Sequence, residues 1–314
     1  MGNSGLNFSI IIPTYNSGRY IYDCLMSLES FEYDKDRYEI IVVDGGSSDK
    51  TLEIVNSFTA VKVIHSENIS ISNSRNLAVS KSLGRYLVFI DSDCVVDKHL
   101  LIKAEKSLKS FACYGSFYKA ADHHSWIAKA WSVVERKSDG VVQWLPGGTL
   151  STSRKIFDEV HGFDESLQTE EDEDFCRRVR LNGGVIYNDS SVASVHIGQA
   201  NSIRTFWDKE SWRGKSIIKP IRFYRANGFS IFDLMISGYF LLIIVTIFMI
   251  IFYPKASPVA ILLLMLLPLV LSLRVTMRRK SCNMLGYIYI LYAMFLLARC
   301  WSIIKFNQLK TIVS

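Results

Sequence analysis

Two carboxylates stand one residue apart directly after an apolar run in this chain of 314 residues. Residues 87–90 read Leu-Val-Phe-Ile, and Asp91, Ser92 and Asp93 follow them. Continuous hydrophobicity is typical of a strand covered on both faces, and ligands of open parallel sheets bind where such strands end. Carboxylates at this spacing can hold a divalent cation, and Mg²⁺ or Mn²⁺ suits oxygen ligands. The stretch therefore predicts a metal-dependent site for a phosphorylated ligand.

Alternating strands and helices must position these carboxylates. Apolar runs predict strands at residues 8–12, 39–43, 61–64 and 86–90, and a helical period predicts helices at 17–30, 48–58 and 70–82, the second capped by Ser47 or Ser48. This order predicts an α/β fold with a parallel sheet and right-handed crossovers. Polar residues that follow three of the strands then meet at one edge of the sheet, namely Thr14 to Asn16, Asp44, and Asp91 to Asp93.

The sequence has no G-x-G-x-x-G loop and no Walker lysine at the start of these helices. Dinucleotide dehydrogenases and P-loop kinases are therefore disfavoured. Without a backbone cradle, a bound diphosphate needs another way to neutralise its charge. A cation held by Asp93 would do this as a Lewis acid.

The last third of the chain is far more apolar than the rest. Ile231–Phe252 is long enough to span hydrocarbon, which takes about 20 residues, and residues 257–273 suit the return arm of a hairpin. Residues 287–304 contain Arg299, which costs about 2.5–3.5 kcal/mol at a bilayer centre, so this segment either spans or lies in the interface. Buried core helices are the alternative, but no amphipathic segment is left to cover them. We predict a multi-pass membrane region at residues 231–314 with two to three hydrophobic helices.

Basic residues surround the hairpin unevenly. Lys and Arg are dense in residues 201–230 and 274–280, whereas the loop at 253–256 holds only Lys255. Both basic flanks, and the catalytic part with them, are therefore expected on the cytoplasmic side of a cell membrane. Anchoring to the lipid bilayer then explains the net charge of +6, and no nucleic-acid partner is predicted.

Residues 1–7 predict a flexible N-terminus without a signal peptide, and the six cysteines form no CxxC pair.

Four blocks of the chain resemble, in order, those of family 2 glycosyltransferases with the GT-A fold. They are FSIIIPTYNSGRYIYDCLMSL, EIIVVDGGSSDKT, SRNLAVSKSLGRYLVFIDSD and GFDESLQTEEDEDFCRR, and the similarity covers residues 8–196. The resemblance implies a GT-A catalytic domain with a Rossmann-like mixed sheet at 8–200, followed by a basic juxtamembrane or acceptor segment at 201–230. It also implies metal-dependent, inverting transfer from a nucleotide-diphosphate sugar donor. The Gln-x-x-Arg-Trp motif of processive synthases is absent from the sequence, which favours transfer of a single sugar.

The resemblance also assigns a donor and metal site. By this resemblance Asp44 binds the nucleobase, and capping of the next helix is the alternative. Gly45 stands where the family usually has a second Asp. Asp93 is the direct metal ligand, and His196, after the strand-like residues 192–195, resembles a late histidine that some relatives bring to the metal or diphosphate, with a structural histidine as the alternative. The donor-binding residues carried over are Pro13, Thr14, Tyr15, Asp44, Arg75, Asp91 at the ribose, Ser92 and Gly148.

An acidic stretch at residues 170–175 is predicted to open a helix, where carboxylates are favourable through the macrodipole alone. Similarity to Glu-Asp-x-Asp-Phe-x-x-Arg makes Asp172 the general base, with Glu171 as the second candidate and Arg178 further along the helix. Crowded carboxylates raise one another's pKa, which helps a base near neutral pH. Acceptor contacts are assigned to Trp144, Trp212 and Arg213, the last two of which also suit a bilayer surface.

These features predict a membrane glycosyltransferase of polysaccharide or glycan biosynthesis with a lipid-linked or glycan acceptor at the cytosolic face. One alternative is a degenerate transferase that binds nucleotide sugar without turnover, for which Gly45 leaves room. Another is a nucleotidyltransferase, which normally needs a basic Gly-rich phosphate loop. The sequence leaves open the nucleobase, the sugar, the acceptor and the oligomeric state.

Overall fold

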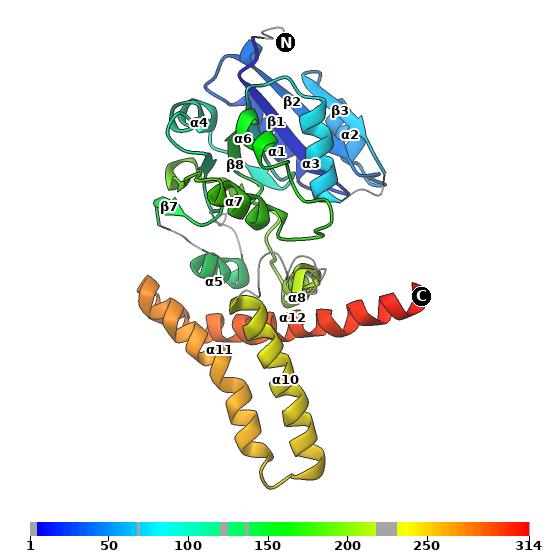
Figure 1. The fold of residues 1–314 in the computed structure, drawn as a ribbon, viewed down its shortest axis with the longest axis vertical. Helices are drawn as coiled ribbons and strands as arrows, with labels where there is room; N and C mark the ends of the chain where they lie inside the picture. The colour runs from blue at the N-terminus through cyan, green and yellow to red at the C-terminus, as the bar shows by residue number, and fades with distance from the viewer. Residues whose placement is uncertain (1–4, 68–69, 120–124, 136–137, 218–230, 314) are drawn as a thin grey trace. The chain divides into compact units, whose positions relative to one another are not determined.

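A computed structural model describes residues 5–67, 70–119, 125–135, 138–217 and 231–313. The chain forms two compact units, and Figure 1 shows their elements. The first unit comprises Met1–Asp122 and Glu135–Gln199, and the second comprises His123–Val134 and Ala200–Ser314. Part of the predicted flexible N-terminus (residues 1–4) and of the predicted basic segment (residues 218–230) lies outside the described residues.

An eight-stranded mixed sheet forms the centre of the first unit, in the order β3-β2-β1-β4-β8-β6-β9-β7. Its parallel half was predicted from the apolar runs and consists of β1 (Phe8–Thr14), β2 (Tyr38–Asp44), β3 (Val61–His65) and β4 (Tyr86–Phe89). In the other half, β8 runs antiparallel to both β4 and β6, β9 runs parallel to β6, and β7 runs antiparallel to β9. These strands are β6 (Cys113–Gly115), β7 (Gly140–Val142), β8 (Leu150–Ser153) and β9 (Ile186–Asn188).

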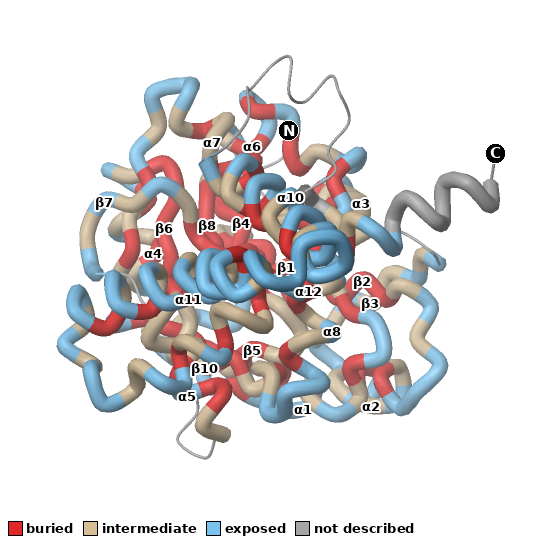
Figure 2. The backbone as a smooth tube through the Cα atoms, turned by 90° about the horizontal axis from the view of Figure 1, so that it is seen from below, coloured by how far each residue is buried: buried red, intermediate tan, exposed pale blue. Residues whose placement is uncertain are grey.

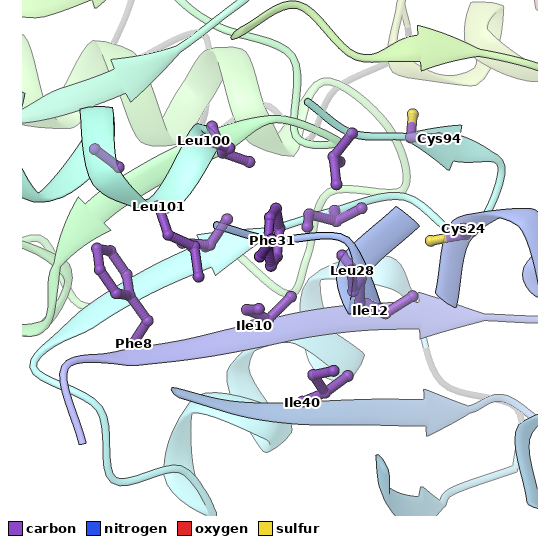
Figure 3. Close-up of a cluster of buried hydrophobic side chains, with 14 of the residues drawn as sticks. Phe8, Ile10, Ile12, Cys24, Leu28, Phe31, Ile40, Cys94, Leu100 and Leu101 are labelled. Carbon is purple, nitrogen blue, oxygen red and sulfur yellow. The ribbon is translucent and has the colours of Figure 1, made fainter. Parts of the chain in front are cut away.

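Hydrophobic cores cover both faces of the sheet. Phe8, Ile10 and Ile12 of β1 join one core, which Figure 3 shows together with Leu28 of a covering helix, whereas Ile11 joins the other. This alternation follows from the period of two along a strand, and it explains why the central strands are apolar at every position. The buried positions in Figure 2 gather in these strands. The helices of the first unit are α1 (Ile21–Glu29), α2 (Thr51–Asn56), α3 (Ile71–Ser80), α4 (Leu100–Ser107), α6 (Arg154–Glu159) and α7 (Glu171–Leu181).

Three of the predicted elements differ from the structure in their start, their cap or their type. Helix α1 begins four residues later than predicted because the N–H groups of Tyr20 and Ile21 both donate to the Ser17 carbonyl and form a turn there. Helix α2 has neither Ser47 nor Ser48 as its cap; instead the Asp49 carboxylate accepts from the Thr51 N–H at 3.0 Å. The predicted strand at 192–195 is a 3₁₀ turn (Ser190–Val192) followed by β10 (Val195–His196), which pairs antiparallel with β5 (Cys94–Val95).

The second unit is helical and contains α5 (Trp126–Glu135), most of which lies in this unit, α8 (Ile203–Arg213), α10 (Ile231–Phe252), α11 (Ser257–Arg279) and α12 (Leu285–Val313). Helices α10 and α11 form an antiparallel hairpin, and α12 runs across one end of it (Figure 1). Among the described residues, three segments are long and apolar enough to cross a membrane, namely Ile231–Phe252, Ser257–Arg279 and Cys282–Lys305. The two arms of the hairpin expose many of their large apolar side chains, as expected of helices that face lipid.

Candidate active site

The candidate site lies at the carboxyl edge of the parallel strands, within the first unit. Backbone and side-chain hydrogen bonds join the segments that follow β1, β2 and β4: the Gly45 N–H donates to the Thr14 carbonyl at 2.9 Å, and the hydroxyls of Ser17 and Ser92 lie 2.8 Å apart. Pro13 is half-buried at the end of β1, and the side chain of Tyr15 is exposed. These segments therefore lie together at one edge of the sheet, as predicted.

Asp44 is buried, and its two carboxylate oxygens are used differently. Oδ2 accepts from the N–H groups of Gly46 and Ser47 at 3.1 and 3.0 Å, which fixes a turn rather than capping helix α2. Oδ1 is buried and has no hydrogen-bond partner among the described residues, and the same is true of the Thr14 hydroxyl. Because a buried acceptor without a partner costs about 1–3 kcal/mol, this oxygen suits a donor group supplied by a ligand.

Arg75 of α3 is 1% exposed and bridges two carboxylates. Its Nη1 donates to Glu171 Oε1 at 2.7 Å and its Nη2 to Asp91 Oδ1 at 2.9 Å, and its guanidinium lies 5.2 Å from the ring centroid of Phe163. Burial alone would lower the pKa of Arg75, but the charges of Glu171 and Asp91 outweigh burial and raise it. Arg75 therefore stays charged and ties α3, the end of β4 and α7 together.

Tyr118 is a site residue that no sequence motif indicated. Its hydroxyl donates to Asp91 Oδ2 at 2.9 Å and accepts from the Gly148 N–H at 3.1 Å. Burial and the Asp91 charge raise the pKa of the phenol well above its ordinary value, so it remains a donor. A Cβ at Gly148 would lie 2.5 Å from both Asp91 Oδ2 and the Tyr118 hydroxyl, so the loop can approach this closely only with glycine there.

We expect Tyr118→Phe to reduce kcat/KM for the donor about tenfold, because a hydrogen bond to a charged group contributes about 1.5–3 kcal/mol. The change should appear mainly as a higher KM, since Tyr118 orients the loop beside Asp91 rather than moving a proton. Steady-state kinetics with varied donor measures it. The matched control is Tyr114→Phe, which also removes a hydroxyl bonded to an aspartate, Asp189 at 2.7 Å, but outside the site. Equal losses in both variants would contradict a positioning role for Tyr118.

Asp93 and His196 form a pair of possible metal ligands in the site. His196 Nε2 lies 2.9 Å from Asp93 Oδ2, and its ring centroid is 4.8 Å from that of Tyr118. Ligand atoms of Asp91, Asp93 and Cys94 lie within 4.8 Å of one another. Both oxygens of Asp91 already accept from Arg75 or Tyr118, so Asp93 and His196 are the better placed ligand pair. A carboxylate with an adjacent imidazole fits Mg²⁺ or Mn²⁺.

Helix α7 presents carboxylates with different surroundings. Asp172 is partly exposed, and its oxygens accept from the Gly147 and Glu173 N–H groups at 2.9 and 2.8 Å. Burial raises the pKa of Asp172, although the Arg75 charge opposes this increase. Burial, and then the Asp172 charge, raise the pKa of Glu171 to about 7. Arg178 lies further along the helix, as expected, and its Nε donates to Asp174 Oδ2 at 2.7 Å.

The sequence profile described as Glycosyl transferase family 2 matches residues 9–166, which is half of the chain. The chain belongs to glycosyltransferase family 2. This family 2 enzyme is similar to poly(ribitol-phosphate) β-N-acetylglucosaminyltransferase TarS of Staphylococcus aureus, with 30% identity over 207 residues that cover 58% of this chain and 34% of TarS. It is also similar to the uncharacterized glycosyltransferase YfnE of Bacillus subtilis, with 38% identity over 118 residues covering 35% of this chain and 30% of YfnE. The chain spans about a third of the length of these relatives.

Solved structures identify the fold of this family 2 glycosyltransferase. The mannosyltransferase PcManGT from Pyrobaculum calidifontis, in complex with GDP-Man and Mn²⁺, has a TM-score of 0.62 at 16% identity and covers 95% of this chain and 86% of its own. TarS 1–349 of S. aureus has a TM-score of 0.50 at 20% identity and covers 96% and 92%. The predicted GT-A fold, with its mixed sheet, is therefore confirmed.

The three predicted acceptor residues of this glycosyltransferase lie in different places. Trp144 is half-buried in the first unit and packs edge-on against Phe117, with ring centroids 5.0 Å apart, three residues before the Gly147–Gly148 loop. Trp212 and Arg213 belong to α8 in the second unit. Trp212 is 49% exposed, and Arg213 donates to Glu210 at 2.7 Å. Of these residues, only Trp144 lies in the same unit as the candidate site.

Proposed function

We propose that this enzyme transfers a single sugar from a nucleotide-diphosphate donor to an acceptor hydroxyl, with inversion and with a divalent cation. One observation supports the proposal most strongly: three carboxylates of the candidate site lie in different surroundings. Asp44 has one unused acceptor oxygen, Asp93 faces His196, and Asp172 lies beside the Gly147–Gly148 loop. A group that recognises the nucleobase, a ligand of the metal and a general base for proton transfer each need a different surrounding.

The donor would bind across the ends of β1, β2 and β4. Asp44 Oδ1 accepts an N–H from the nucleobase, and Pro13, Thr14 and Tyr15 border the nucleotide. Asp91 and Ser92 lie on the ribose side of the site, with Asp91 held in place by Arg75 and Tyr118. That PcManGT is seen with GDP-Man, and a TarS structure with UDP-GlcNAc, supports a nucleotide-sugar donor here.

Asp93 and His196 would hold Mg²⁺ or Mn²⁺ beside the diphosphate. When bound, the cation supplies positive charge that stabilises the departing nucleoside diphosphate. The Mn²⁺ in the PcManGT structure supports a divalent ion. A Cβ at Gly198 would lie 2.0 Å from Asp93 Oδ2, so the backbone after His196 closes tightly around this carboxylate.

Asp172 would act as the general base. Its carboxylate takes the proton of the acceptor hydroxyl while that oxygen attacks the anomeric carbon, the bond from sugar to phosphate breaks, and the nucleoside diphosphate leaves. A single displacement of this kind inverts the anomeric centre. Glu171 is a weaker candidate because Arg75 occupies its carboxylate at 2.7 Å. Base catalysis of this kind contributes about 10²–10⁴-fold.

The acceptor would be lipid-linked or a glycan at the cytosolic membrane face. The apolar helices α10 and α11 would hold the enzyme in the membrane in which a lipid-linked acceptor diffuses. This raises the effective concentration of the acceptor at the site. Lys and Arg concentrated before α10 and at the end of α11 support a cytoplasmic catalytic unit.

A donor panel tests the proposed function. The full chain, reconstituted in vesicles with lipid extract as the acceptor source, is incubated with UDP-, GDP-, ADP- and CDP-linked sugars, and released nucleoside diphosphate is measured. We expect sustained release from one nucleotide class. Binding of a nucleotide sugar with no release under any acceptor condition would instead favour a protein without turnover.

Asp44→Asn should change which nucleobase binds. Its amide must keep the oxygen on the side that accepts from Gly46 and Ser47, so the NH₂ group replaces Oδ1 and faces the base. A single acceptor fits the one imide N–H of uracil, whereas guanine offers two adjacent donors. We therefore expect wild type to prefer UDP, and the variant to lose about 10- to 100-fold in UDP affinity and to bind CDP, whose ring N3 accepts. Calorimetric titration measures both. Equal losses for the two nucleotides would contradict base reading by Asp44.

The pH dependence of kcat/KM should have its acid limb well above pH 4. A general base works only when deprotonated, so activity is full above its pKa and falls as the pH decreases through it. The pKa values of Asp172 and Glu171 are raised, the latter to about 7, and the pair titrates jointly. Initial rates from pH 5 to 9 measure the limb, whose apparent pKa should lie well above the ordinary carboxyl value of about 4. A flat profile down to pH 5 would contradict the assignment.

A further inference from the structure

A buried ion pair joins α12 to α8. Arg299 Nη2 and Nε lie 3.1 and 3.2 Å from Glu210 Oε2, and Nη1 donates to the Arg213 carbonyl at 2.9 Å. Glu210 is 1% exposed, so its charge depends on these partners. Helix α8 also exposes Arg204 and Asp208, which are poorly tolerated in hydrocarbon. Helix α8, and Arg299 with it, therefore lies outside the hydrocarbon core.

Both ends of the stretch from Leu285 to Arg299 lie at the same end of the α10–α11 hairpin. Leu285 follows a short turn after α11, in which the Ser281 N–H donates to the Thr276 carbonyl at 2.9 Å. At the other end, Phe295 packs against Phe232 in the first turn of α10 with ring centroids 5.9 Å apart, and Arg299 lies 5.6 Å from the Phe232 ring. The start of α10 and the end of α11 belong to one end of an antiparallel hairpin (Figure 1).

The length of this stretch decides its orientation. Fourteen residues of helix advance about 21 Å, which is most of the hydrocarbon thickness of about 30 Å. If α12 crossed the bilayer from Leu285, Arg299 would lie near the opposite side from Phe232. The contacts to Phe232 and Glu210 place it on the same side instead. A spanning α12 is incompatible with these contacts.

One face of α12 is an exposed apolar stripe. Its described members recur at intervals of three, four or seven residues, and they are 40–49% exposed: Tyr287, Ile290, Leu297, Trp301 and Ile304. Residues on the other side, including Leu291 and Phe295, are buried, and Trp131 of α5 packs against Phe295. Trp126 of α5 packs against Tyr287 at the start of the stripe, with ring centroids 5.2 Å apart. A helix covered by protein on one side and apolar on the other, with Tyr and Trp in the stripe, matches helices that lie in the membrane interface.

We propose that α12 lies in the plane of the membrane surface, with the stripe of Tyr287, Ile290, Leu297, Trp301 and Ile304 immersed in the headgroup and upper acyl region of the lipid. Of the three apolar helices that the structure describes, the α10–α11 hairpin alone then crosses the bilayer. Helices α5 and α8 cover the side of α12 that faces away from the lipid, and the Arg299–Glu210 pair fixes α12 to α8. The end of α12 stays on the side of the membrane where α10 begins.

Depth measurements by spin labelling test this proposal. Of the six cysteines, only Cys282 is exposed, so single labels can be introduced in a Cys282→Ser background. Labels replace Tyr287, Leu297 and Ile304 in the full chain in vesicles, and depth is measured from collision with oxygen and with a water-soluble nickel complex. We expect the three positions to share one shallow depth, about 5–10 Å below the headgroups. The matched control, a label at Ile244 in the middle of α10, should lie about 15 Å deep.

Two outcomes would overturn the proposal. If α12 spans, Leu297 would be much deeper than Tyr287 and Ile304. If the stripe binds a second copy of the chain, labels at all three positions would be shielded from both collision partners and would broaden one another's spectra. An independent measurement is the side of a C-terminal tag, which an in-plane α12 leaves on the same side as an N-terminal tag and a third span moves to the opposite side. Neither readout depends on sugar transfer, so failure of the proposed function leaves this test intact.

Discussion

Asp172→Asn is expected to lower sugar transfer by about 10²–10⁴-fold while donor affinity stays close to that of wild type. The amide cannot take the proton of the acceptor hydroxyl. It can still accept from the Gly147 N–H, which contacts Asp172 at 2.9 Å, so the loop beside the donor keeps its support. Product release at saturating donor gives the rate, and titration with the nucleoside diphosphate in the presence of Mn²⁺ gives the affinity.

The control for Asp172→Asn is Glu173→Gln, which removes an exposed carboxylate from the same helical turn. This variant should keep the wild-type rate. Glu171→Gln separates the two base candidates, because it removes the carboxylate that Arg75 holds at 2.7 Å and should weaken donor binding as well as turnover. Joint loss of binding and transfer in Asp172→Asn would move Asp172 from the role of base to that of support for the loop.

Asp93→Asn is expected to reduce turnover at least about 100-fold and to remove the gain in donor affinity that Mn²⁺ gives the wild type. A neutral amide offers a weaker ligand to a hard cation, and ligands of this kind dominate metal affinity. His196→Gln should have a smaller effect in the same direction, since it removes the partner of Asp93 at 2.9 Å but leaves the carboxylate. Donor titration with and without Mn²⁺ measures both variants.

Asp97→Asn is the matched control for the metal site. Asp97 lies four residues further along the same segment, and its carboxylate accepts from the His99 N–H at 2.9 Å, away from the candidate site. We expect this variant to keep both its rate and its response to Mn²⁺. Turnover by Asp93→Asn that remains sensitive to EDTA would show that another residue carries the metal.

The parallel half of the sheet was predictable because its strands are covered on both faces, which leaves an uninterrupted apolar run such as residues 87–90. Because parallel strands end at the same edge of a sheet, the sequence alone predicts that Asp44 and Asp91 lie close together. Their roles as base-reading and ribose-binding groups stay predictions. Helix starts were less predictable. Ser47 and Ser48 suit a cap by sequence, but in the fold both form hydrogen bonds with Asn16, which follows β1, and α2 begins later, at Thr51.

The network inside the site could not be predicted from local patterns. Arg75 is 96 residues from Glu171 in sequence, and Tyr118 is 27 residues from Asp91, yet both pairs are hydrogen-bonded. Arg75 lies in one of the family blocks and Tyr118 in none of them, but neither context indicates which carboxylate the residue contacts. The close packing of Gly147 and Gly148 against Arg75 and Tyr118 is likewise a property of the folded chain. Similarly, hydropathy predicts a long apolar segment at α12, whereas its proposed orientation in the membrane surface depends on the contact between Arg299 and Glu210, which the sequence does not show.

We propose that a divalent cation at Asp93 and a general base at Asp172 act together in the transfer of a sugar from a nucleotide donor. The most direct test is the rate of nucleoside diphosphate release by the wild-type chain after metal is removed with EDTA, followed by titration with Mn²⁺ or Mg²⁺. We expect a rate at background without metal and a saturable recovery as either ion is added. A rate that is undiminished in EDTA would contradict it.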